Sequence, residues 1–502
     1  MVSFNNIPDS RLPFMWVEFD NSAALSSKPI WKTLIIGYKS VIGIAKENEL
    51  ILINSEKQAI EYFGEGSNLH QQIAVYKKND TNVETWAVAI SEVSTAKPAK
   101  AGLLFDLIVP SDQIADGVIS LFMFGEIIDI PIVGSKKIDD ITAQIASAIT
   151  TNKKVPVVAD VDKTDPRLVI FSTQHKSNIY NVGYSVIKNE FENKPLPSNL
   201  KIGVIPADKK LNSIFSGGDG EPDLESLFKN VIKDQRFNAF VSPFFSKKSN
   251  KFFSEILNKR TMPGSQNDGV SFITTTISDL NDLVLKDSFG SLNSEYILPF
   301  SYANSLSPAY LINAAIAAQV SLSASLDPGM PLQTLPLYGI QPPILKNRAT
   351  TEERNSFLNN GFGTVTTVAE IPRIERALTS YKLNDNGIPD ESYLSAENIF
   401  ILSFLRFDIK SYFWSKYSRF KLGNDGGNYS NSQKIMTPNL AKSEIISRFL
   451  KWEEMGLVQD SKIFIDNLVV ERNSKNRGRL DFLLPPKLID QLVQVSMQIQ
   501  FR

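Results

Sequence analysis

The sequence predicts a mixed α/β protein, α+β overall, built on a mostly parallel sheet, with a β-rich inserted domain and extended N- and C-terminal arms. Three observations predict this fold class. Strand-like apolar runs alternate with amphipathic helical runs between residues 201 and 326, as in a parallel sheet with crossover helices. A series of short strand-like runs interrupts the chain between 103 and 190. Both ends of the chain have the pattern of extended, apolar segments.

Shifts of pattern along the chain predict its organisation. The length of 502 residues is sufficient for two to four domains. The expected parts are an N-terminal arm (1–20), a first part of the core (21–95), a β-rich inserted domain (96–195), an α/β domain (196–370), a C-terminal domain (371–490) and a C-terminal strand arm (491–502).

The first part of the core is expected to contain strands and two helices. Apolar runs predict strands at 33–38, 51–53 and 84–91. Ser55 is a suitable N-cap for a helix that ends near Gly64, and a second helix is expected to start at Ser67.

The inserted domain is expected to begin where the pattern changes, near 94–102. Short strand-like runs come next: "LLFDLIV", "GVISLFMFG", "IIDIPIVG", "VPVVADV", "RLVIFST" and "NVGYSVIK". Between them, residues 136–150 predict one helix. Ser135 would cap it, and four isoleucines form one stripe: Ile138, Ile141, Ile145 and Ile149.

From residue 201 the expected strands and helices alternate. The strands are "KIGVIP", "NAFVSP", "VSFITTT" and "EYILPF". The helices are "PDLESLFKNVIKD", "SNKFFSEILNKR", "SDLNDLVLK" and the Ala-rich run 308–326. Residues 327–370 are expected to be rich in loops.

Beyond residue 370, a strand over "RIERALTSYKL" and helices at about 395–415 and 438–455 are expected. Thr437, Pro438 and Gly456 bound the second helix with the usual start and stop signals. A strand over "IDNLVVERN", a short helical turn after "RGRLDFLLPP" and a terminal strand complete the prediction.

Composition excludes several classes of function. The chain has 53 Lys and Arg against 54 Asp and Glu, and this balance argues against direct binding of nucleic acid or anionic membrane. The absence of Cys excludes disulfides, thiol nucleophiles and thiolate metal sites. No apolar run approaches the ~20 residues that span a bilayer, and residues 1–14 lack the regions of a signal peptide, so no membrane insertion is expected.

No motif predicts catalysis, a cofactor or a metal. The Gly-rich loop 216–220 lacks the Lys and the Ser or Thr of a P-loop. The acidic run 159–167 lacks the central Gly and the terminal Glu of an EF-hand. His70 and His175 are the only imidazoles, and neither lies beside a nucleophile motif. These observations favour a structural or assembly role over an enzyme.

The two ends raise the question of what they pair with. At the C-terminus every second residue is apolar, the pattern of a strand that buries one face. Each end either pairs inside its own subunit or adds a strand to the sheet of a neighbour, and the pattern leaves both open. The apolar positions are Phe14, Trp16, Val17 and Phe19 in the N-terminal arm and Val493, Val495, Met497, Ile499 and Phe501 in the C-terminal arm.

Stretches scattered over nearly the whole chain resemble the tail sheath proteins of Mu-like contractile phages. They include "RLPFMWVEFDNSAA" (11–24), "YFGEGSNLHQQ" (62–72), "DPGMPLQTLPLYGIQPP" (327–343), "LTSYKLNDNGIPDESYLSAENIF" (378–400) and "VVERNSKNRGRLDFLLPPKLIDQL" (469–492). Their order and number carry the resemblance. The sequence departs from the pattern at Gly329 and Met330, where Ala and Arg are expected, and it diverges most before residue 200.

This resemblance implies a structural subunit of a contractile sheath, with no cofactor. Such subunits polymerise as stacked hexameric rings around a tail tube and contract to drive the tube through the host envelope. The implied partners are further copies of the chain, the tube protein, and the baseplate and tail terminator proteins. The implied location is the virion, after assembly in the host cytoplasm. The arms would link neighbouring subunits, and the inserted domain would face outward.

The resemblance also implies that a helix of the inner region contacts the tube through charged groups. The candidate is 438–455, with Lys442, Arg448 and Lys451 on its polar side. Alternative interpretations are the sheath of a non-phage contractile injection system, an α/β enzyme that binds a phosphorylated ligand at 216–220, and a tail tube protein.

Overall fold

The structure is a computed structural model, which describes residues 30–108, 114–133, 137–183, 185–187, 196–203, 205, 211–281, 289, 292–430 and 433–501. The described chain forms two compact units, a main unit over Ile30–Ile399 and a C-terminal unit from Phe400 onward. The N-terminal arm, with Phe14, Trp16, Val17 and Phe19, lies outside the described residues.

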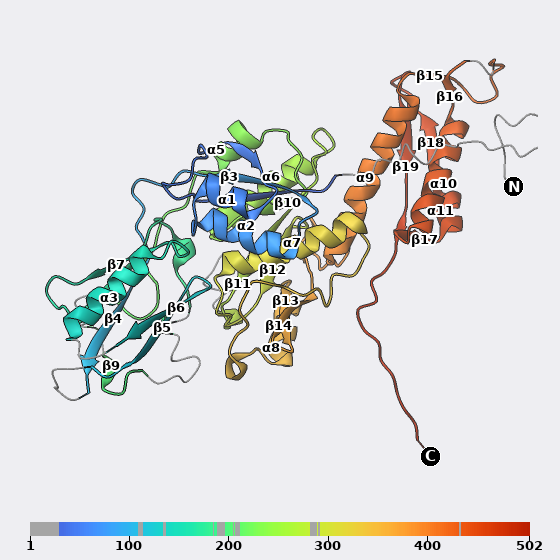
Figure 1. Ribbon diagram of the computed structural model, residues 1–502. Helices are drawn as coiled ribbons and strands as arrows, with labels where there is room; N and C mark the ends of the chain where they lie inside the picture. Colours follow the sequence, from blue (N-terminus) through green and yellow to red (C-terminus); the bar gives the residue numbers. More distant parts are fainter. Residues whose placement is uncertain are drawn as a thin grey trace, which may run out of the picture. The chain divides into compact units, whose positions relative to one another are not determined.

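The main unit contains an eight-stranded sheet with strand order β14-β13-β12-β11-β10-β1-β3-β2. Figure 1 labels β10, β11, β12, β13 and β14 of this sheet. The six strands from β13 to β3 in this order run parallel, and the two edge strands β14 and β2 are antiparallel to their neighbours. The mostly parallel α/β sheet is therefore confirmed. The strands are β1 (Lys32–Gly37), β2 (Leu50–Leu52), β3 (Glu84–Ala89), β10 (Ala239–Val241), β11 (Val270–Thr275), β12 (Ile297–Ser301), β13 (Gly363–Val368) and β14 (Ile371–Arg376).

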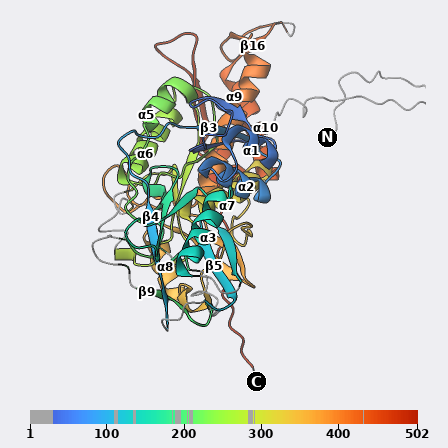
Figure 2. The same ribbon diagram turned by 60° about the vertical axis from the view of Figure 1, so that its left-hand side comes forward.

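Helices cover this sheet because their apolar positions match its buried strands. In α7 (Ala309–Leu326), Ala and Ile pack almost continuously against the sheet, and the helix contacts β10, β11 and α2. It is also long and apolar enough to span a membrane, but it is mostly buried inside the main unit. Figures 1 and 2 both show α1 and α2 side by side. The other helices of the main unit are α1 (Glu56–Phe63), α2 (Asn68–Asn79), α5 (Leu224–Leu227), the π-helical turn η3 (Phe228–Ile232), α6 (Lys247–Thr261), the turn η5 (Leu345–Asn347) and α8 (Thr351–Asn359).

The expected inserted strands form separate small sheets. One has the order β7-β8-β4-β9 and is antiparallel, and β5 and β6 form a hairpin. The expected position of "KIGVIP" in the large sheet is wrong, because β9 pairs with β4 instead. The elements are β4 (Lys100–Leu107), β5 (Gly117–Met123), β6 (Glu126–Ile132), α3 (Ile138–Thr151), β7 (Val157–Val161), β8 (Leu168–Thr173), the turn η1 (Asn178–Tyr180) and β9 (Leu200–Gly203).

The C-terminal unit packs helices against three two-stranded sheets, β15–β16, β17–β20 and β18–β19. Its core contains Ile401, Ile445, Phe449 and Trp452. A strand, β20, occupies the position of the expected short helical turn. The elements are α9 (Ala396–Tyr417), which begins in the main unit, β15 (Lys421–Leu422), β16 (Ile435–Met436), α10 (Pro438–Glu454), β17 (Val458–Gln459), α11 (Ser461–Asn467), β18 (Val469–Arg472), β19 (Leu480–Leu483) and β20 (Lys487–Leu488).

Candidate functional site: the C-terminal segment

The last residues of the chain extend away from the folded part of the C-terminal unit. Residues 491–501 form no helix and pair with no strand among the described residues, and Figure 1 shows them as an extended trace. Their apolar side chains are exposed by 46% (Val493), 61% (Val495), 85% (Met497), 87% (Ile499) and 94% (Phe501). Among the described residues, therefore, nothing pairs with the strand that this alternating pattern predicts.

The segment starts from a fixed point. Strand β20 pairs with β17, and the amide of Ile489 donates to the carbonyl of Leu457 over 3.2 Å. The side-chain amide of Gln459 donates to the carbonyl of Leu488 over 3.1 Å. Lys487 Nζ lies 2.6 Å from Asp460 Oδ2. These contacts anchor the chain up to Ile489, and the exposed residues 493–501 follow this anchor.

The neighbouring hairpin β18–β19 has the properties of an acceptor. Val470 pairs with Phe482, and both side chains pack on the core of the unit. Val469 and Leu483 lie on the opposite, exposed face. Among the described residues no third strand extends this sheet, so each strand has an outer edge with backbone groups available for pairing.

Helix α10 forms where the sequence predicts it. The Thr437 hydroxyl accepts from the amide of Leu440, and Pro438 occupies the first turn. Of the three basic candidates on this helix, Lys451 is exposed and Lys442 is half-buried.

The expected position of Arg448 on the polar side of α10 is wrong. Its side chain is buried, and its guanidinium donates through two nitrogens to both carboxylate oxygens of Asp408 on α9. The indole nitrogen of Trp452 donates to the same carboxylate over 2.7 Å. Arg448 therefore ties α10 to α9 inside the unit. The sequence gives no signal for Asp408 as the partner, because it lies in a different helix.

The Gly-rich loop 216–220 uses amides in contacts within the subunit. The amide of Gly218 donates to Asn181 Oδ1 over 2.9 Å, and the amide of Asp219 donates to the carbonyl of Lys97 over 3.1 Å. The helix after the loop, α5, has only four residues. The amides of Gly218 and Asp219 are therefore not free to bind a phosphate.

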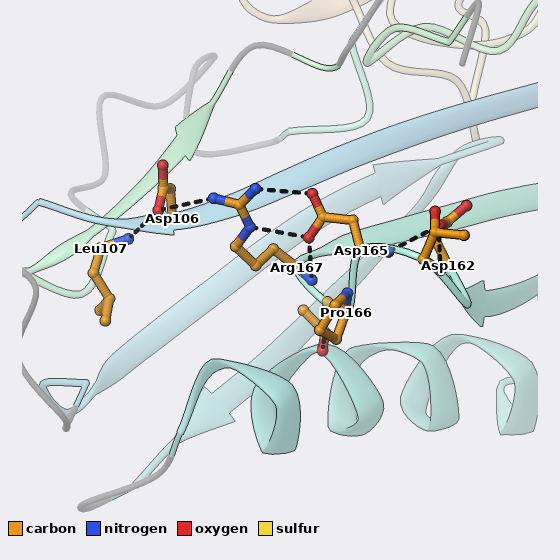
Figure 3. A network of polar contacts seen from close by, with 8 residues as sticks. Asp106, Leu107, Asp162, Asp165, Pro166 and Arg167 are labelled. Carbon is orange, nitrogen blue, oxygen red and sulfur yellow. Dashed lines mark hydrogen bonds and ion pairs between the residues drawn. The ribbon is translucent and has the colours of Figure 1, made fainter. Parts of the chain in front are cut away.

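The acidic turn near residue 162 is a closed polar network (Figure 3). Asp162 Oδ1 accepts from the amides of Thr164 and Asp165 over 2.8 and 3.0 Å. Arg167 binds the Asp165 carboxylate through two nitrogens, each at 2.9 Å, and approaches Asp106 to 3.7 Å. The hydrogen bonds from Arg167 hold the pKa of Asp165 below its usual value. No group of three or more metal-binding side chains occurs in the described part of the chain.

Both histidines have structural environments. His70 Nδ1 accepts from the amide of Gly66 over 3.0 Å, and burial lowers the pKa of His70. His175 Nδ1 lies 2.6 Å from Glu92 Oε1, and its ring stacks with those of Tyr38 and Tyr180. Among the described residues, no Ser or Thr hydroxyl bonds to either imidazole.

Two comparisons with known protein sequences match this chain. The family model for the phage tail sheath C-terminal domain matches residues 389–502. The chain is 30% identical to the Mu-like prophage FluMu tail sheath protein of Haemophilus influenzae over 513 aligned positions, which cover 100% of this chain and 99% of that protein.

Two solved sheath structures align over most of this chain, both with a TM-score below 0.5. The crystal structure of the sheath tail protein from Desulfitobacterium hafniense has a TM-score of 0.49 at 10% identity, over 95% of this chain and 97% of that one. The contracted helical sheath of the anti-feeding prophage has a TM-score of 0.47 at 8% identity, over 98% and 99%. On the full-length match to the prophage protein, the chain belongs to the tail sheath proteins of Mu-like phages and is a structural subunit of a contractile tail sheath.

Proposed function

We propose that copies of this chain polymerise as stacked hexameric rings around a tail tube, linked by strands that each copy donates to a neighbour. Contraction of this polymer drives the tube through the host envelope. Assembly takes place in the host cytoplasm, on a tube that grows from a baseplate and ends at a terminator protein. The α/β and C-terminal domains form the inner layer, and the inserted domain faces outward.

The observation that carries the proposal is the exposed, alternating C-terminal segment. A free amphipathic strand is an aggregation hazard, so a soluble protein normally covers it. Residues 493–501, at about 3.3 Å each, reach about 30 Å, which is enough to cross to another molecule. Burying one Val, Ile, Met or Phe side chain contributes about 1.5–3 kcal/mol. Donation of the segment to a neighbour therefore provides both backbone pairing and apolar burial.

The acceptor in this proposal is the β18–β19 hairpin of the neighbouring copy. An added strand continues the face formed by Val470 and Phe482 with its own apolar side chains. Its glutamines then lie on the outer face beside Glu471 and Asp481. The alternation of the segment matches the alternation of the hairpin, which is the requirement for β-augmentation.

Such links are suited to a polymer that contracts. Contraction requires two packings of the same subunits that differ in free energy and are separated by a barrier. A strand link keeps its backbone hydrogen bonds while the compact units rotate, provided that the chain before the strand bends. Residues 491 and 492, which carry no helix or strand, supply that bend in the proposal.

The test separates the apolar side of the segment from its polar side. Deletion of residues 493–502 is expected to leave a folded monomer that forms no tubes in negative-stain microscopy. The triple variant Val495→Ser, Met497→Ser and Ile499→Ser should behave like the deletion.

The matched control is Gln494→Ser with Gln498→Ser, which changes the polar side of the same segment and should still form tubes. Tubes of normal width from the deleted protein would overturn the proposed strand donation.

A further inference from the structure

Three β-branched side chains are exposed together in the loop between β1 and β2. Val41 is 98% exposed, Ile42 61% and Ile44 64%. Single exposed apolar side chains are normal, but three within four residues form a patch of the kind found at interaction sites. We refer to residues 41–44 as the apolar loop.

The apolar loop is held in one conformation. The amides of Ser40 and Ala45 donate to the carbonyls of Phe63 and Tyr62, each over 2.9 Å, at the end of α1. Gly43 packs so closely that an added Cβ would lie 2.5 Å from the backbone of Phe63. Because the backbone is fixed and β-branched side chains have few rotamers, a partner that binds the loop loses little entropy in ordering it.

The surroundings of the apolar loop are acidic. Residues 39–65 contain five Glu and three Lys, which is a net charge of −2, and Lys39 Nζ donates to the carbonyl of Gly43 over 3.2 Å. The same asymmetry holds for the whole chain. Residues 400–502 carry 16 Lys and Arg against 10 Asp and Glu, which leaves 37 against 44 for residues 1–399. The main part of the chain is thus negative by 7 charges and the C-terminal part positive by 6. Two parts of opposite sign in one chain attract each other between copies.

An exposed face of α9 complements the apolar loop, because it offers a large apolar side chain and positive charges. Arg406, Lys410 and Trp414 are spaced by four residues, so they lie on one side of the helix, and all three are exposed. The Trp414 side chain is 76% exposed. Trp and Arg are enriched among the residues that dominate protein interfaces. We refer to these three residues as the α9 stripe.

We propose that the apolar loop of one copy docks on the α9 stripe of another copy. Val41, Ile42 and Ile44 pack on Trp414, and the acidic surroundings of the loop face Lys410 and Arg406. A second copy is the occupant because the complementary charge and the exposed indole lie on the same chain. The two surfaces differ, so the contact is heterologous and repeats along a polymer.

This inference rests on the proposed function, since it requires that copies polymerise. It adds a contact between compact units that is separate from the strand link. Cross-linking tests it directly, because the chain contains no Cys and engineered thiols have no background. Copies with Lys46→Cys, beside the apolar loop, are mixed with copies with Ser415→Cys, beside the α9 stripe, assembled and treated with a short bismaleimide.

The expected product is a covalent dimer that needs both variants and assembled protein. The control mixes Ser415→Cys with Val133→Cys, a site on another part of the chain that is 68% exposed, and should give no dimer. Assembled tubes that give no dimer between Cys variants at Lys46 and Ser415 would overturn the inference and leave the proposed function intact. Wild-type protein that forms no tubes would instead overturn the proposed function.

A second measurement uses the assembly threshold. Val41→Asp with Ile44→Asp should raise the protein concentration needed for tubes at least tenfold, and Lys410→Glu should raise it as well. Lys410→Arg keeps the positive charge and should leave the threshold concentration unchanged. Val133→Asp should also leave it unchanged. Unchanged circular dichroism of each monomer shows that folding is retained. An unchanged threshold for the Val41 and Ile44 variant contradicts the docking.

Discussion

Replacing Arg448 tests whether this side chain is a structural tie or a surface contact. In the variant Arg448→Met, the carboxylate of Asp408 stays buried. It loses both hydrogen bonds from Arg448 and keeps the one from the indole N–H of Trp452. Removing one partner of a buried ion pair costs about 3–5 kcal/mol, because the remaining charge is left uncompensated. For a unit of ~100 residues each kcal/mol lowers the melting temperature by about 4 °C or more. The melting temperature of the C-terminal unit should therefore fall by on the order of 12 °C or more.

The assay is urea unfolding followed by tryptophan fluorescence, with calorimetry for the melting temperature. Trp452 is buried in the core of the C-terminal unit and reports on its unfolding. The matched control is Lys451→Met, which removes an exposed charge from the same helix and should change the free energy of unfolding by about 0.5 kcal/mol or less.

A double variant checks the cause of the loss. Arg448→Met with Asp408→Asn removes both charges and keeps an oxygen that accepts from Trp452. Because a buried pair can be replaced by neutral groups at little cost, most of the lost stability should return. If the Arg448→Met protein is as stable as the Lys451→Met control, Arg448 does not form a stabilising buried ion pair with Asp408 and is a surface residue.

Three further predictions concern other parts of the chain. Glu397 is buried and accepts from the amide of Leu332 over 3.1 Å, and burial raises its pKa, so the folded state holds this proton more tightly than the unfolded state. Stability should therefore fall as pH rises from about 4.3 through the raised pKa, and Glu397→Gln should flatten this fall in melting temperatures measured from pH 4 to 7. Lys442→Glu with Lys451→Glu should weaken co-sedimentation with purified tail tubes without lowering the melting temperature, and unchanged binding would remove both lysines as tube contacts. Gly66 has φ of 74°, and an added Cβ would lie 2.0 Å from the carbonyl oxygen of Lys153, so Gly66→Ala should destabilise the main unit by about 1–3 kcal/mol in calorimetry.

Local signals in the sequence predict single elements well. Thr437 and Pro438 mark the start of α10, and Ser55 and Gly64 mark the ends of α1, because caps act within one turn of the chain. The alternation from strand to helix also predicts the parallel sheet, since each crossover depends on neighbouring segments.

Features that depend on residues distant in the sequence cannot be predicted from local signals. The four residues of β9 are apolar enough for either sheet, and only the position of β4 decides which one they join. Charge alone predicts a position for Arg448 on the polar side of its helix. Its actual position is decided by Asp408, which lies 40 residues earlier in the chain. The exposed apolar loop 41–44 has a composition close to that of a buried turn, so the sequence alone does not distinguish it.

The C-terminal segment shows what an alternating sequence pattern predicts and what it does not predict. Alternation from Val493 to Phe501 predicts a strand, yet a strand requires a partner that a single chain does not provide among the described residues.

The measurement that tests this account most directly is a cryo-EM map of tubes assembled from the purified protein. We expect continuous density that carries residues 493–501 from one copy onto the edge of the β18–β19 hairpin of the next. Density that folds the same residues back onto their own copy, with no strand between adjacent copies, would contradict the account.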